Sequence, residues 1–72
     1  MKTAAEVWIF RHADPATGEL VAKLQFTDFA EILARRLCEL YSYPVEVRYT
    51  AEGFPTRRYE WGKIEGFGVT VV

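Results

Sequence analysis

Apolar residues recur at helical spacing between Asp28 and Tyr43 and at every second position on both sides of this segment. A period of three to four residues is typical of an amphipathic helix, and a period of two is typical of strands with one buried face. The apolar face of the expected helix holds Phe29, Ile32, Leu33, Leu37, Leu40 and Tyr41. We expect Leu33 and Leu37, in the middle of this face, to anchor the helix on a sheet.

The start and the outer face of the helix carry polar residues in a recognisable order. Either Thr27 or Asp28 is expected as the N-cap. With Asp28 in that role, Glu31 completes a capping-box-like pair. Arg35 lies four residues from both Glu31 and Glu39, so weak ion pairs are expected along the outer face.

Strand-like segments flank the helix: Val7–Phe10, Leu20–Phe26, Val45–Thr50 and a segment that begins at Thr56. The first is apolar on both faces, which indicates a central strand. The second and third alternate, with the apolar face of the second formed by Leu20, Ala22, Leu24 and Phe26. The fourth is interrupted by glycines, so we expect a bend near Gly62. Phe67, Val69 and Val71 then either continue it or form a short fifth strand.

The expected fold is therefore α+β: residues 1–72 form one small domain in which an antiparallel ββαββ sheet, with or without a fifth strand, packs on one amphipathic helix. One helix covers only one face of such a sheet. The other face is then solvated, paired with another copy, or used for binding. Because it carries Val21, Lys23, Arg48 and one set of first-strand side chains, we expect a homodimer through it.

Composition narrows the functional classes. The chain has 72 residues, is 50% hydrophobic and 15% aromatic, and has a net charge of −1. One small core is expected, rich in large side chains. Basic and acidic residues are spread over both halves, which speaks against an extended nucleic-acid footprint.

Cysteine and histidine are too scarce for the commonest metal and redox chemistry. Cys38 is the one cysteine of the sequence, which excludes an internal disulfide and any cysteine-based zinc site. Its position in the middle of the helix predicts a buried, unreactive thiol. The apolar run near the N-terminus is too short for a signal peptide or a membrane span. We therefore expect a cytoplasmic protein without metal or cofactor.

One segment, Val7 to Asp14, invites a catalytic interpretation. It resembles the strand-to-loop opening of the histidine phosphatase family, in which an apolar strand delivers an Arg-His pair and the histidine accepts the phosphoryl group. The resemblance covers eight residues. That family also needs a second histidine and a larger parallel α/β fold, which this chain lacks. Phosphatase-like chemistry at Arg11 and His12 is therefore kept only as a second alternative.

Basic and aromatic residues are interspersed between Arg57 and Lys63, as in proteins that bind single-stranded nucleic acid. On a pleated strand, however, Arg57, Tyr59 and Trp61 share one face, so the rings are expected in the core or on the sheet surface. Protein binding suits arginine and aromatic residues better, because both recur at interface hot spots. Nucleic-acid binding through the Arg57–Trp61 strand is the first alternative.

The sequence thus predicts a non-enzymatic protein-binding module. The candidate partner-binding residues are Phe54, Arg57, Arg58, Tyr59, Trp61 and Arg48. Phe54 stands beside Pro55 in a turn, where side chains face solvent. Small cofactor-free chains of this character are common among phage and mobile-element proteins that inhibit a host machine, including anti-CRISPR-type inhibitors, and we expect a role of that kind.

Overall fold

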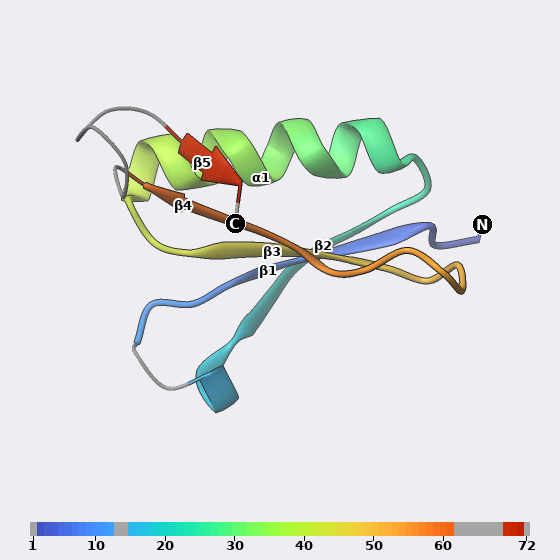
Figure 1. Cartoon of the computed structure of the whole chain (residues 1–72), viewed down its shortest axis with the longest axis horizontal. Helices are drawn as coiled ribbons and strands as arrows, with labels where there is room; N and C mark the ends of the chain where they lie inside the picture. The colour runs from blue at the N-terminus through green and yellow to red at the C-terminus, as the bar shows by residue number, and fades with distance from the viewer. Residues whose placement is uncertain (1, 13–14, 62–68, 72) are drawn as a thin grey trace.

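The computed structural model contains a five-stranded antiparallel sheet with one helix lying along one face (Figure 1). It describes residues 2–12, 15–61 and 69–71. The elements are β1 (Ala5–Ile9), η1 (Pro15–Thr17, a 3-10 turn), β2 (Glu19–Leu24), α1 (Thr27–Tyr41), β3 (Val45–Tyr49), β4 (Arg57–Trp61) and β5 (Val69–Val71). The α+β class and the ββαββ order are confirmed, and the last segment forms a separate fifth strand. The bend expected near Gly62 lies outside the described residues.

The sheet has the order β2-β1-β3-β4-β5, so β1 lies between two neighbours, as its apolar composition predicted. The pairing of β1 with β2 shifts by one residue at Val21, because Ala22 lies opposite Val7 whereas Leu20 lies opposite Trp8. Such a bulge moves the side chains on its two sides to opposite faces. The expectation that Leu20 shares one apolar face with the later residues of this strand is therefore wrong.

The face of α1 that contacts the sheet is formed by small residues. Ala30, Ala34 and Cys38 are fully buried, while Leu33 and Leu37 are only partly buried against the same core. Small side chains let a helix approach a sheet closely, and the bulkier neighbours are then displaced to the sides. The predicted burial of Phe29, Ile32, Leu40 and Tyr41 is wrong, since all four are exposed. The buried thiol of Cys38 is confirmed.

The ends and the outer face of α1 also differ from expectation. The N-cap is Phe26, with no side-chain hydrogen bond, in place of Thr27 or Asp28. At the other end Ser42 adopts the left-handed conformation, and its N–H donates to the carbonyl oxygen of Cys38 at 2.9 Å.

The ion pairs predicted along the outer face of the helix do not form through Arg35. Its guanidinium lies 5.9 Å from the centre of the Tyr59 ring, an arrangement in which a cation is attracted to the ring face. Glu39 pairs instead with Arg36, at 3.2 Å. Glu31 turns toward the sheet, where it contacts β3 and β4.

The face of the sheet opposite α1 is covered by charged side chains lying over aromatic rings. The Arg48 guanidinium lies 4.4 Å from the centre of the Trp8 ring, and that of Arg58 lies 5.3 Å from the centre of the Phe10 ring. Phe10 is consequently 2% exposed, although no helix among the described residues covers it. A homodimer through this face was expected because apolar residues there would be uncovered. Trp8 and Phe10 are covered by arginines, so this reason does not hold for them. The homodimer itself stays a prediction.

The loop between β1 and β2 closes over the same aromatic ring. A Cβ atom built on Gly18 would lie 2.6 Å from Cε2 of Phe10, closer than side-chain carbons approach one another. Glycine at this position therefore lets the backbone pass directly against the ring.

Candidate functional site

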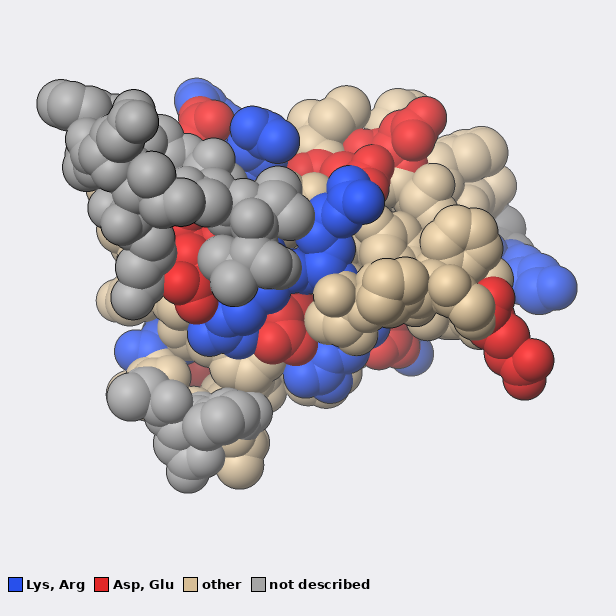
Figure 2. All heavy atoms as spheres, viewed as in Figure 1, with Lys and Arg blue, Asp and Glu red and all other residues tan. Residues whose placement is uncertain are grey.

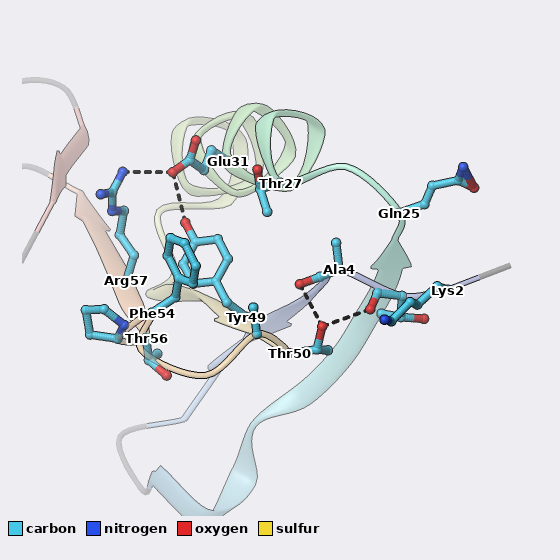
Figure 3. Close-up of a pocket in the computed structure, with 13 residues that line it drawn as sticks. Lys2, Ala4, Gln25, Thr27, Glu31, Tyr49, Thr50, Phe54, Thr56 and Arg57 are labelled. Atoms are coloured by element: carbon cyan, nitrogen blue, oxygen red, sulfur yellow. Dashed lines mark hydrogen bonds and ion pairs between the residues drawn. The ribbon is translucent and has the colours of Figure 1, made fainter.

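A cavity of about 640 Å³ opens at one end of the molecule, between α1 and the β3–β4 turn (Figure 3). Three chain segments form its walls: the residues before β1, the start of α1, and the hairpin from the end of β3 to the start of β4. Its lining residues are Lys2, Thr3, Ala4, Gln25, Thr27, Glu31, Tyr49, Thr50, Ala51, Phe54, Pro55, Thr56 and Arg57. A volume of this size is within the range of sites that bind ligands or insert side chains of a partner.

A hydrogen-bonded group of three side chains fixes one wall of the cavity. The Tyr49 hydroxyl donates to Oε1 of Glu31 at 2.9 Å, and Nη1 of Arg57 donates to the same oxygen at 2.8 Å. These residues come from β3, α1 and β4, so the group ties the helix to two strands. Figure 3 shows both bonds meeting at the Glu31 carboxylate. Charge-assisted bonds of this kind hold side chains in place more firmly than neutral ones.

The environment of Tyr49 alters its titration. Burial, followed by the hydrogen bond to Glu31 and the negative charge of that carboxylate, raises the pKa of Tyr49 to about 12, from a usual value of 10. The neutral phenol is thus favoured in the folded protein. At neutral pH the hydroxyl remains a donor, which keeps the wall of the cavity intact.

We expect this pKa to be measurable by alkaline titration. The difference in phenolate absorbance between the wild type and Tyr49→Phe should have its midpoint near pH 12. Glu31→Gln should lower that midpoint, because the carboxylate disfavours ionisation of the phenol. A difference midpoint at the usual pKa of tyrosine, about 10, would contradict the partly buried hydrogen bond to Glu31.

The same titration has a consequence for stability. Because the pKa of Tyr49 is higher in the folded than in the unfolded state, its contribution is fully present below about pH 10 and is lost as the pH rises toward 12. The free energy of unfolding of the wild type should therefore fall more steeply over this interval than that of Tyr49→Phe. Urea unfolding at several alkaline pH values measures the difference.

Phe54 forms the outer aromatic wall of the cavity. Its ring is tilted by 48° to that of Tyr49, with 5.9 Å between the ring centres, yet 63% of the residue is exposed. The turn that carries it contains Gly53 at φ 89°, a backbone conformation that glycine adopts without strain. Phe54 is therefore held beside Tyr49 while presenting most of its surface to solvent.

The pleat of β3 and β4 divides the predicted partner-binding residues between the two faces of the sheet. Phe54 and Arg57 line the cavity, whereas Arg48 and Arg58 lie on the face opposite α1. Tyr59 is 2% exposed and belongs to the core. Trp61, at the end of the same strand, is exposed. The structure thus brings Phe54 and Arg57 together at the cavity, and Arg48 and Arg58 together around Glu46 on the opposite face.

Positive charge on β4 is matched by nearby carboxylates. Arg58 binds Glu46 at 2.7 Å and Glu60 at 2.8 Å, and Arg57 binds Glu31. On the side of the molecule seen in Figure 2, basic and acidic side chains alternate across the centre. These arginines are therefore engaged within the protein, which leaves them less available to follow a phosphate backbone.

The sequence interpretation missed Glu31, Tyr49 and Lys2 as residues of the site. The sequence predicts a capping and outer-face position for Glu31, and a place in an alternating strand for Tyr49. The sequence contains several carboxylates that could pair with Arg57, and nothing in it distinguishes Glu31 from the others. Only the packing of α1 on β3 and β4 selects Glu31.

The residues proposed for phosphatase-like chemistry lie at the far end of β1. The guanidinium of Arg11 donates to both carboxylate oxygens of Glu19, at 2.6 and 2.8 Å from Nη2, and His12 is exposed. The donors that would face a phosphate are thus partly used by a carboxylate. Among the described residues, histidine, cysteine, aspartate and glutamate form no cluster that could hold a metal ion. Burial raises the pKa of Cys38, which disfavours its reactive thiolate.

Comparisons with family models, curated proteins and solved structures each return no match for this chain. Within the described ranges, no helix has the length and apolar character needed to cross a membrane. The function is therefore inferred from the geometry of the site.

Proposed function

We propose that this chain is a non-enzymatic protein-binding module and that a partner binds at the cavity between α1 and the β3–β4 turn. The observation that carries the proposal is the position of Phe54, which is largely exposed yet held against Tyr49 at the mouth of a cavity. An exposed aromatic ring on a fixed support loses little conformational freedom when it is buried by a partner. Such residues are frequent hot spots of protein interfaces.

The rest of the cavity supplies groups that would orient a partner side chain. The ring of Phe54 and that of Tyr49 offer an apolar wall, while Glu31 and Arg57 form a fixed polar edge. Lys2 lines another part of the cavity. A binding site that combines an apolar surface with a few placed polar groups gives both affinity and orientation.

A more specific role, inhibition of a host machine by a phage- or mobile-element-encoded protein of the anti-CRISPR type, is part of this proposal. It is supported by the small size of the chain and by a candidate site that contains residue types common at protein interfaces, an exposed aromatic residue and an arginine. Nucleic-acid binding along β4 is less favoured, because Arg57 and Arg58 are paired with carboxylates and Tyr59 is buried.

The proposal is tested by comparing Phe54→Ala with Leu20→Ala. Both residues are exposed and apolar, but Leu20 lies on β2, outside the lining of the cavity. A partner captured from a lysate of the source organism is purified, and its affinity for each variant is measured by calorimetry. Phe54→Ala should weaken binding by about fivefold or more, whereas Leu20→Ala should leave it unchanged.

Thermal unfolding of the same variants separates binding from stability. If Phe54 instead closes the edge of the core, its removal lowers the melting temperature and leaves the affinity per folded molecule unchanged. That result would overturn the assignment of the binding surface. Equal losses of affinity in both variants would also contradict it.

A further inference from the structure

The helix carries a second apolar surface, distinct from the cavity proposed above. Beside the buried row of Ala30, Ala34 and Cys38, four large apolar residues of the helix and its N-cap are exposed: Phe26, Phe29, Ile32 and Leu40. Phe26 and Phe29 contact each other edge to face, with 5.5 Å between ring centres. The exposed fractions are large, 58% for Phe29 and 65% for Ile32. An exposed apolar surface of this extent on one helix is a candidate interaction site.

The order of residues along this surface is that of a helix-packing seam. Phe29, Leu33, Arg36 and Leu40 are separated by four, three and four residues, the spacing by which one helix packs along another. At about 100° of rotation per residue, the seam lies roughly a third of a turn from the row that contacts the sheet. No other described helix or strand lies beyond α1 on the side away from the sheet (Figure 1). A second helix can therefore pack there without displacing the sheet.

We infer that the seam of α1 packs antiparallel against the same seam of a second copy of this chain. Reversing α1 about its midpoint places Phe29 opposite Leu40, with Ile32 at the rim, and this pair is made twice in a symmetric dimer. Leu33 then meets Arg36, whose aliphatic stem can cover it while its charged end stays with Glu39 at the rim. The surface is thus complementary to itself, and a second copy is the occupant that this symmetry selects.

The area of the surface agrees with a dimer of modest affinity. With about 150–250 Å² for a full aromatic side chain, the exposed fractions correspond to roughly 500 Å² of apolar surface on each copy. Two copies would bury at most about 1,000 Å² in total, near the lower limit for a specific interface. This dimer uses a face of the helix, and not the face of the sheet opposite α1.

Sedimentation over a concentration series tests the inference. The wild type should pass from monomer to dimer between low micromolar and about 1 mM protein. Phe29→Glu should raise the dissociation constant about tenfold or more, because it buries a charge in the seam. Val21→Glu, which introduces the same charge at an exposed apolar position of β2, should leave it unchanged. Circular dichroism establishes that each variant is folded.

Disulfide crosslinking tests the antiparallel arrangement directly. In a Cys38→Ala background, Phe29→Cys mixed with Leu40→Cys should form a mixed dimer on mild oxidation. Either variant alone should crosslink much less, because two copies of position 29 lie roughly 16 Å apart along antiparallel helices. A strict monomer at about 1 mM would overturn the inference and leave the seam for a different protein. A dimer that resists Phe29→Glu, or one that Val21→Glu disrupts, would equally overturn it.

Discussion

Replacement of Tyr59 by alanine is expected to lower the free energy of unfolding by about 3–5 kcal/mol, the range for removal of a buried aromatic side chain. Tyr59 has the largest of the fully buried side chains and is 2% exposed. It lies on β4 opposite Val45, beneath α1, and Arg35 lies near its ring. In a chain of 72 residues such a loss is a large share of the total stability. Urea unfolding followed by circular dichroism measures it.

Trp61→Ala is the matched control for this prediction. Trp61 is two residues along the same strand and shares its face with Tyr59, but it is 40% exposed. Its removal should cost clearly less, about 1–2 kcal/mol. Equal losses for the two variants would show that the core beneath α1 is not centred on Tyr59.

A second large effect is expected when a small residue beneath the helix is enlarged. Ala34→Leu should destabilise the fold by about 1–3 kcal/mol or more, because Ala34 is fully buried between α1 and the sheet and leaves no room for three additional carbons. The helix must then move away from β1 and β3 or the new side chain must adopt a strained rotamer. Thermal and urea unfolding both report the change.

Glu39→Leu provides the comparison, since it introduces the same side chain on the exposed side of the helix. It removes one exposed ion pair with Arg36, which contributes at most about 1 kcal/mol. If Ala34→Leu were tolerated as well as Glu39→Leu, the close approach of helix and sheet would be wrong. In that case the originally expected face, centred on Leu33 and Leu37, would have to carry the packing.

The helix illustrates how far periodicity reaches. Its existence and approximate length followed from the spacing of apolar residues, and the observed helix ends at Tyr41, two residues earlier than expected. The face that contacts the sheet was predicted wrongly, because a hydrophobic pattern gives most weight to large apolar residues and little to alanine. The closeness of two packed elements depends instead on the small residues between them. Ala30 and Ala34 carry little hydrophobic weight in the sequence, yet they set this distance.

The candidate site shows a similar division. Phe54 was recognisable from the sequence because an aromatic residue in a Gly-Pro turn has little local reason to be buried. Its neighbours in the cavity were not recognisable. Glu31 and Arg57 are 26 residues apart, and their contact exists only because α1 crosses β3 and β4. Arg58, adjacent to Arg57, lies on the other face of the sheet because successive residues of a strand point in opposite directions.

The sequence alone determined the α+β class, the order of the elements, the central position of β1 and the burial of Cys38. These features depend on local preferences and on short-range periodicity, both of which can be recognised from residues that are close together in the sequence. Tertiary structure decided which side of α1 is buried, how Arg48 and Arg58 cover Trp8 and Phe10, and which carboxylate holds Arg57. These features depend on the register of strands and on contacts between distant segments, and such contacts are fixed only when the whole core packs together.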